Sequence, residues 1–235
     1  MWIIKIGTLR SVFFHNYNIQ CSIKEGDRGM KTVFKMLRGQ LITSVGIAMV
    51  IASGFGAFPC TTCNIAFVNW TGLSYGVVNM LVELLFIGYA VSRGERLGWG
   101  AVMNCVLGGF IVDAVLPFLG FTWLPIRIGM ALVGVIMLAL GYATIGRQGQ
   151  GETGSNMALT ALMKQFGLTV GVSRTIMEVT YIIIGLLGHG GVGWFTIVLS
   201  LGFGAVCSIV YKLIHYEPTK VVQNYIKVPL TKRIH

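Results

Sequence analysis

Two glutamates interrupt apolar stretches of this 235-residue sequence, and a shift of 95 residues places one on the other. Glu83 lies within the apolar stretch 73–91, and Glu178 lies within 168–187. A charged residue in the middle of a membrane helix costs about 3 kcal/mol on insertion scales, so it usually faces the protein interior or a solute pathway. The repeated glutamate therefore predicts a polar site that binds a solute and exchanges a proton.

Each glutamate has a polar residue one helical turn before it. Asn79 precedes Glu83 by four residues, and Arg174 precedes Glu178 by the same spacing, which puts each pair on one helix face. We predict that these four side chains form a substrate-binding site between the two copies. Glu83, with its neutral neighbour, is expected to carry the proton, and Glu178 to stay ionised beside Arg174. The alternative is that Arg174 and Glu178 pair only to hold the helices together.

Asp113 is the fifth candidate for the substrate-binding site. It lies in the outer part of the apolar stretch 98–119, and the repeat places Ser208 at the same position. Asn104 lies deeper in the same stretch. Either side chain could line a pathway for a solute, or satisfy a neighbouring backbone group.

The sequence Cys60-Thr-Thr-Cys63 follows Pro59 and has the spacing of redox motifs. A helix N-terminus lowers the pKa of a thiol, so thiol exchange is one interpretation; the packing of two small apolar side chains is the other. No second Cys-x-x-Cys motif and no His cluster completes a metal site in the sequence. We therefore predict no metal, no cofactor and no enzymatic activity.

An internal repeat supplies the elements that position these residues. Residues 39–113 align with residues 134–208 without a gap, and fifteen of the 75 pairs are identical. Apolar stretches of membrane length recur in both copies, which predicts an all-α polytopic membrane protein. The predicted membrane helices cover residues 37–53, 73–91, 98–119, 126–145, 168–187 and 192–213.

One transmembrane domain is expected over residues 37–213, with repeat one at 37–119 and repeat two at 126–213. A leader (1–36) and a basic tail (214–235) flank this domain. Three helices in each repeat would place the two copies in the membrane with opposite orientation. Such inverted repeats are typical of secondary transporters, although channels and proteins without a transport role also have them.

A glycine-rich break and a short segment separate the first two helices of each repeat. The short segments are residues 60–70 and 155–166, which are too short to cross a membrane. We predict two re-entrant or interfacial helices, the second capped by Ser155, whose N-termini offer N–H groups to an anion or a polar solute. Amphipathic helices that merely connect the spans are the alternative.

The net charge of +10 is distributed as in a membrane protein. Lys and Arg gather in residues 1–38 and 212–233, whereas the loops at 54–72, 120–125 and 188–191 contain none. By the positive-inside rule both termini are predicted to be cytoplasmic, where the basic tails would meet anionic lipid headgroups of the bilayer. This distribution argues against binding of nucleic acid.

Several motifs in the two repeats carry a resemblance to a known family. They are Gly54-x-Gly-Ala-x-Pro59, Thr71-Gly-Leu-Ser-Tyr-Gly76, the helix with Glu83, Gly98-Trp-Gly100 with Asp113, and Gly167-Leu-Thr-Val-Gly171 with Arg174 and Glu178. On these motifs the chain resembles, over residues 38–213, the YczE-like (YczE/YyaS/YitT-type) family of bacterial integral membrane proteins. The resemblance implies a multi-pass protein of a bacterial plasma membrane and supplies no substrate. Where the family often carries Asp in the short segments, this chain has Thr61 and Asn156.

From the residues and the resemblance we predict a secondary transporter or permease for a small polar solute. Two other classes of function stay open. One is a non-transporting accessory or scaffold subunit of a larger membrane assembly. The other is a membrane thiol oxidoreductase that uses Cys60 and Cys63.

Overall fold

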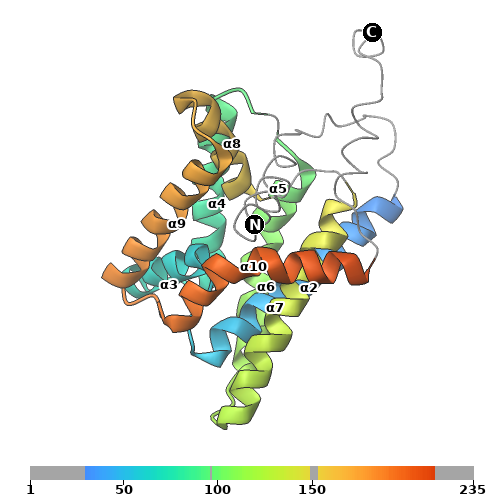
Figure 1. Cartoon of the computed structure of the whole chain (residues 1–235), viewed down its shortest axis with the longest axis vertical. Helices are drawn as coiled ribbons and strands as arrows, with labels where there is room; N and C mark the ends of the chain where they lie inside the picture. The colour runs from blue at the N-terminus through green and yellow to red at the C-terminus, as the bar shows by residue number, and fades with distance from the viewer. Residues whose placement is uncertain (1–29, 96, 149–152, 215–235) are drawn as a thin grey trace, which may run out of the picture.

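The computed structural model describes residues 30–95, 97–148 and 153–214, and every regular element in these ranges is helical. Most of the predicted leader and of the basic tail lies outside these ranges. The α-helices are α2 (Met30–Ser53), α3 (Pro59–Thr71), α4 (Tyr75–Ser92), α5 (Trp99–Met103), α6 (Gly109–Val115), α7 (Leu124–Gly146), α8 (Gly154–Phe166), α9 (Val170–Leu187) and α10 (Trp194–Leu213) (Figure 1). A π-helix, η2 (Asn104–Gly108), joins α5 to α6, and a 3₁₀-helix, η3 (Leu116–Leu119), follows α6.

Five stretches of the described chain are long and apolar enough to cross a membrane. They are Thr32–Ser53, Tyr75–Ser92, Trp99–Leu119, Leu124–Gly146 and Trp194–Leu213. The predicted sixth membrane helix, at 168–187, is present as α9 but is not among these five. The all-helical, membrane-like character of the chain is therefore confirmed, whereas the six-helix inverted arrangement stays a prediction.

The 95-residue offset relates elements as well as residues. Moved by this offset, the bounds of α3 and α4 coincide with those of α8 and α9, and the start of α5 coincides with the start of α10. Both short helices also end in the same way. Gly72 (φ 70°) and Gly167 (φ 62°) occupy the left-handed conformation after α3 and α8, a conformation that glycine adopts without steric cost. The two short helices predicted from the glycine-rich breaks are thus confirmed.

The antiparallel pair α2 and α7 forms the centre of the molecule (Figure 1). A Cβ atom added to Gly46 would lie 2.7 Å from the carbonyl oxygen of Gly134, and one added to Gly39 would lie 3.3 Å from that of Gly141. In the 95-residue repeat Gly39 is equivalent to Gly134, and Gly46 to Gly141. The Gly46–Gly134 contact and the Gly39–Gly141 contact are therefore repeat equivalents of each other. Small residues at such crossings let membrane helices pack at short distance.

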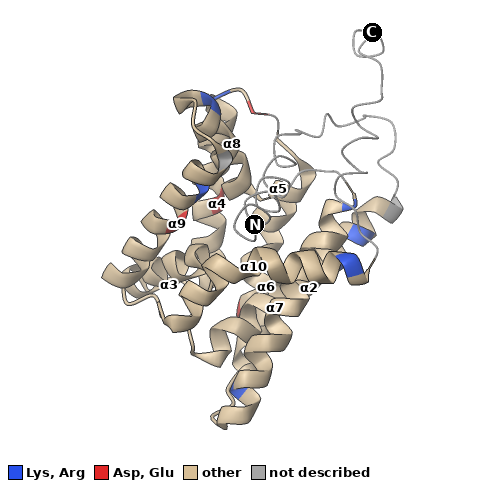
Figure 2. Cartoon of the chain, viewed as in Figure 1, with Lys and Arg blue, Asp and Glu red and all other residues tan. Residues whose placement is uncertain are grey.

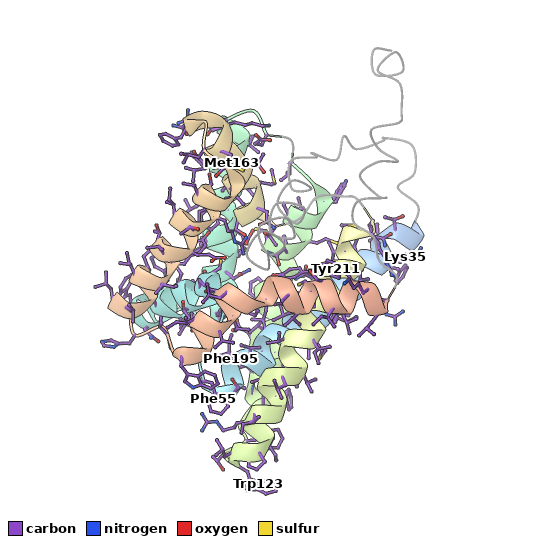
Figure 3. All side chains as sticks on the ribbon, in the orientation of Figure 1. Lys35, Phe55, Trp123, Met163, Phe195 and Tyr211 are labelled. Atoms are coloured by element: carbon purple, nitrogen blue, oxygen red, sulfur yellow. The ribbon has the colours of Figure 1, made fainter. Side chains whose placement is uncertain are left out.

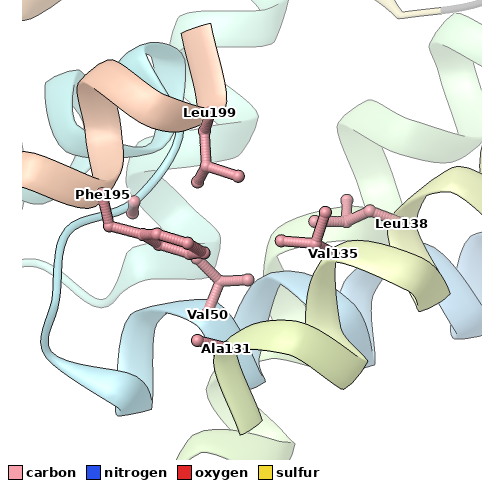
Figure 4. Close-up of a cluster of buried hydrophobic side chains, with 7 residues drawn as sticks. Val50, Ala131, Val135, Leu138, Phe195 and Leu199 are labelled. Atoms are coloured by element: carbon pink, nitrogen blue, oxygen red, sulfur yellow. The ribbon is translucent and has the colours of Figure 1, made fainter. Parts of the chain in front are cut away.

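A hydrophobic cluster fills the space between this pair and the N-terminal half of α10. Figure 4 shows Phe195 and Leu199 of α10 directed toward Val50 of α2 and Val135 of α7. Further along α7 and α10, a second cluster contains Ala139, Cys207 and Val210. Figure 3 shows Met163 toward the upper end of the long axis and Trp123 at the lower end, with Phe55 and Phe195 near each other between them.

The remaining helices pack across the repeats. α3 of the first repeat lies against α9 of the second, and α8 of the second lies against α4 of the first. One boundary differs from the sequence-based expectation. α2 begins at Met30 rather than at residue 37. The expected start came from the apolar stretch alone, and the first turns of the helix contain basic residues that lie outside this stretch.

Candidate functional site

Glu83 is buried at the N-terminus of the short helix α8. The residue is 4% exposed, and its Oε2 accepts the backbone N–H of Gly154 at 2.6 Å. The Ser155 N–H and the Asn104 side chain also lie near this carboxyl group. A carboxylate at a helix N-terminus is stabilised by the unpaired N–H groups of the first turn and by the helix dipole. A buried acidic group thus joins the two repeats.

Gly154 permits this contact because it has no side chain. A Cβ atom added there would lie 2.6 Å from Glu83 Oε2 and 2.9 Å from the Glu83 carbonyl oxygen. α8 is capped by Thr153, whose hydroxyl accepts the Asn156 N–H at 3.4 Å. The prediction that Ser155 caps α8 is therefore wrong. The backbone is extended at Thr153 and already helical at Gly154, so Ser155 lies inside the helix.

A chain of polar side chains continues from the Glu83 carboxyl group into α2. Gln40 Nε2 donates to Asn104 Oδ1 at 3.2 Å and to Ser44 Oγ at 3.2 Å. The Ser44 hydroxyl donates to the carbonyl of Gly108, at the end of the π-helix. Neither Gln40 nor Ser44 was among the predicted site residues. Their signal in the sequence is a pair of polar residues four apart on one face of an apolar helix.

Arg174 and Glu178 form an ion pair within α9. Arg174 Nε lies 2.7 Å from Glu178 Oε1, and the two side chains are 42% and 23% exposed. Arg174 Nη1 also donates to Asn156 Oδ1 of α8 at 3.4 Å. In Figure 2 these charged positions stand out on a helix that is otherwise uncharged. Glu178 is therefore less buried than Glu83, and its charge is balanced within its own helix.

The Asn79 side chain, on the same helix as Glu83, is bonded to α3. Its Oδ1 accepts from Asn64 Nδ2 of α3 at 3.1 Å, and both residues are buried. The backbone N–H of Gly154 at the start of α8 forms a charge-assisted hydrogen bond with Glu83. Asn79 pairs instead with the neutral side-chain amide of Asn64. The Tyr75 hydroxyl lies near the side chains of Asn64 and Thr61. Asn79 thus belongs to a polar group around the first turns of α3.

Asp113 fixes the start of α4. Its Oδ2 accepts the backbone N–H of Gly76, the second residue of that helix, at 2.8 Å. Next to this hydrogen bond, α4 and α6 are in close contact. A Cβ atom added to Gly109 would lie 2.7 Å from the Cα of Gly76. The sequence allowed Asp113 either to line a pathway for a solute or to bond a backbone group. In this conformation it bonds the backbone N–H of Gly76.

The N-termini of both short helices approach the same charged groups. Cys60, at the start of α3, lies within electrostatic range of Glu83 and Arg174. Gly154, at the start of α8, is bonded to Glu83 itself. The two helices differ in one respect, because the repeat places Pro59 where α8 has Gly154, and proline has no N–H to donate.

Both short helices run away from this centre along a long helix of the other repeat. At the far end of α8, Gln165 Oε1 accepts the Tyr89 hydroxyl at 2.6 Å, and Lys164 pairs with Glu95 at 2.7 Å. Near the far end of α3, Asn69 Nδ2 donates to the carbonyl of Gly188 at 2.9 Å. Each short helix therefore extends from the middle of a long helix to its end.

The two cysteines of the Cys-x-x-Cys motif are free thiols on α3. Burial raises the pKa of Cys63 to about 11, and burial and the nearby Glu83 raise that of Cys60 still further. Such thiols are protonated at neutral pH and are poor nucleophiles. Within residues 30–95, 97–148 and 153–214, no three His, Cys, Asp or Glu side chains cluster as metal ligands would. A small apolar hollow near Trp99 contains none of the site residues.

Comparison with known proteins shows a family and one distant relative. Residues 30–219 match the model of a family of unknown function, DUF6198. An uncharacterized protein of Haemophilus influenzae is 22% identical over 189 residues, which cover 80% of this chain and 87% of that protein. No solved structure matches the chain. The resemblance to YczE-like proteins stays a prediction.

Proposed function

The chain belongs to the DUF6198 family of unknown function, and we propose that it is a secondary transporter or permease for a small polar solute. The observation that carries this proposal is the buried Glu83 carboxyl group on the N-terminus of α8. In secondary transporters, interrupted helices direct their N-terminal ends toward a site near the middle of the bilayer, at the boundary between two repeats. The N-terminus of α8 at Glu83, and that of α3 near Glu83 and Arg174, support such a site.

The glycine contacts between α2 and α7 support an inverted repeat. Equivalent residues meet in antiparallel order, Gly39 with Gly141 and Gly46 with Gly134. Two antiparallel helices related by a pseudo-two-fold axis would place that axis in the membrane plane if both helices span the bilayer. We propose that α9 is the sixth span, that both termini are cytoplasmic, and that the membrane is the plasma membrane of a bacterium.

A difference between the repeats supports two alternating conformations. In repeat one, Gly76 and Gly109 bring α4 and α6 into contact. The repeat places Gly171 and Gly204 at the same positions of α9 and α10, and nothing lies within 4 Å of a Cβ atom added to either. The second pair of glycines thus makes no close contact in this conformation. We propose that transport closes the Gly171–Gly204 contact and opens the Gly76–Gly109 contact.

Proton uptake by Glu83 would couple to this movement. When ionised, the carboxylate accepts the Gly154 N–H and holds α8 against α4. When protonated, it loses the charge that makes this hydrogen bond strong, and the N-terminus of α8 is free to bind another acceptor. Glu178 is instead paired with Arg174 inside α9.

The raised pKa values of the Cys60 and Cys63 thiols argue against a thiol oxidoreductase. Uptake of radiolabelled metabolites by the purified protein in lipid vesicles tests the transporter proposal. We expect accumulation of at least one small polar solute, and we expect it to change when a proton gradient is imposed. Absence of uptake, together with stable co-purification with an ATPase, would instead support an accessory subunit.

A further inference from the structure

The two short helices have the same place in their repeats, but only α8 has an acidic side chain at its N-terminus. Glu83 accepts the N–H of Gly154, the first residue of α8. At the equivalent end of α3, Pro59 has no N–H, and Glu178 is turned toward Arg174. No side chain caps α3. The N–H groups of Cys60 and Thr61 therefore form the unpaired first turn of a 13-residue helix.

Buried polar groups next to this turn also lack partners. The Tyr181 hydroxyl, on a residue that is 9% exposed, has no hydrogen-bond partner among the described residues, and it lies within electrostatic range of Cys60 and Arg174. Asn79 Nδ2, also on a residue 9% exposed, has no partner either, although its Oδ1 is held by Asn64 of α3. Unpaired buried donors are costly, and a ligand with acceptor oxygens would satisfy them.

The charges around this turn favour an anion over a neutral solute. The positive end of the α3 dipole lies at Cys60, and the Arg174 guanidinium, which also pairs with Glu178, lies near it. Glu83, also near Cys60, opposes an anion when it is ionised and no longer does so when it is protonated. A proton on Glu83 and an anion at α3 would therefore bind together.

We propose that the N-terminus of α3, with the Tyr181 hydroxyl and the Asn79 amide, binds the carboxylate of a small organic acid, which would be the transported substrate. This inference rests on the proposed transport function and names the class of its substrate. In the second repeat the Glu83 carboxylate itself binds the N-terminus of α8, through the N–H of Gly154. The Glu83 carboxylate is thus an example, within the same protein, of a carboxylate bound at the N-terminus of a short helix.

Thermal unfolding of the purified full-length protein in detergent tests the inference. The probes are sodium acetate and sodium lactate, with sodium chloride at equal ionic strength and acetamide as controls. We expect either carboxylate to raise the melting temperature, more at pH 5.5 than at pH 7.5, with no comparable effect of chloride or acetamide. Equal shifts with chloride, or no shift with either carboxylate, would overturn the proposal.

Two variants separate binding from folding. Tyr181→Phe keeps the ring contact with Phe86 and removes one donor to a charged ligand, so the apparent Kd for acetate should rise about tenfold or more. Tyr89→Phe, which removes a hydroxyl bonded to Gln165 outside the site, should leave this Kd unchanged. Equal Kd values in Tyr181→Phe and the wild type would contradict the assignment of the hydroxyl.

The uptake assay distinguishes failure of this inference from failure of the transport proposal. Proton-dependent uptake of a neutral or cationic solute, without any effect of carboxylates, would refute the inference and keep the proposed function. Carboxylate binding without uptake of the same compound in vesicles would keep the binding site at α3. It would refute the transport function and, with it, the role of the carboxylate as substrate.

Discussion

The rings of Phe86 and Tyr181 pack edge to face with centroids 6.0 Å apart, and the two residues occupy the same position of the two repeats. A residue that touches its own repeat equivalent lies beside the pseudo-two-fold axis. In the inverted repeat proposed above, this axis would therefore pass between α4 and α9, about one turn beyond Glu83 and Glu178. The proposed arrangement would put the candidate site next to the axis, where two repeats that alternate between conformations would both contact one solute.

The contact between Gly154 and Glu83 leaves no room for a side chain. Gly154→Ala would place a methyl group 2.6 Å from Glu83 Oε2, so we expect the free energy of unfolding to fall by about 1–3 kcal/mol. Gly202→Ala is the matched control, because nothing lies within 4 Å of the added Cβ there, and alanine is the better helix former. Thermal unfolding in detergent measures both. Equal melting temperatures would contradict the contact.

The ion pair in α9 is expected to matter more when only one partner is removed. Glu178→Gln leaves the Arg174 charge without its carboxylate, and Arg174→Gln leaves the opposite charge. Because both side chains are partly exposed, each loss should be smaller than the ~3–5 kcal/mol of a fully buried pair. The double variant should lose less stability than the sum of the two single losses. Additive losses would show that the pair contributes no coupling.

Closure of α9 on α10 is testable at two neighbouring glycines. Gly204→Leu and Gly202→Leu both find open space in this conformation, so both proteins should fold. Only Gly204 is the repeat equivalent of Gly109, which touches α4, so only its substitution should block the contact proposed for the other conformation. We therefore expect reduced uptake in Gly204→Leu and normal uptake in Gly202→Leu. Normal uptake in both would refute closure at this position.

The thiols of α3 are expected to react slowly at physiological pH. Because burial raises the pKa of Cys63 to about 11, the thiol is protonated below that pH, and alkylation should accelerate only as the pH rises toward it. Mass spectrometry after iodoacetamide treatment at pH 7.5, 9 and 10.5 measures this profile. Rapid alkylation of Cys63 at pH 7.5 would contradict its burial.

The sequence predicted the all-helical character and the two short helices, whereas the six-helix inverted arrangement stays a prediction. The single offset of the repeat relates the bounds of α3 to those of α8, because equivalent glycines end both helices. Burial of Glu83 was also expected, since an isolated carboxylate in an apolar segment has few other places to go.

The partners of the site residues could not be predicted in the same way. Helical spacing shows which side chains share a face, and it correctly indicated the pair Arg174–Glu178 within one helix. It gave no information on contacts between helices. The Gly154 N–H that Glu83 binds and the Asn64 amide that Asn79 binds both lie on other helices. These contacts depend on tertiary packing that no periodicity in a single sequence records.

Proton-driven uptake by Glu83→Gln in lipid vesicles tests the central claim most directly, with Glu95→Gln as the matched control. Glutamine keeps the size of the side chain and an acceptor oxygen for Gly154, but it cannot exchange a proton. Glu95 is a buried carboxylate that pairs with Lys164 away from the site, so its variant should retain proton-dependent uptake. We predict that Glu83→Gln folds normally and loses the response to a proton gradient. A full proton-dependent response in folded Glu83→Gln would contradict the role of this carboxylate in transport.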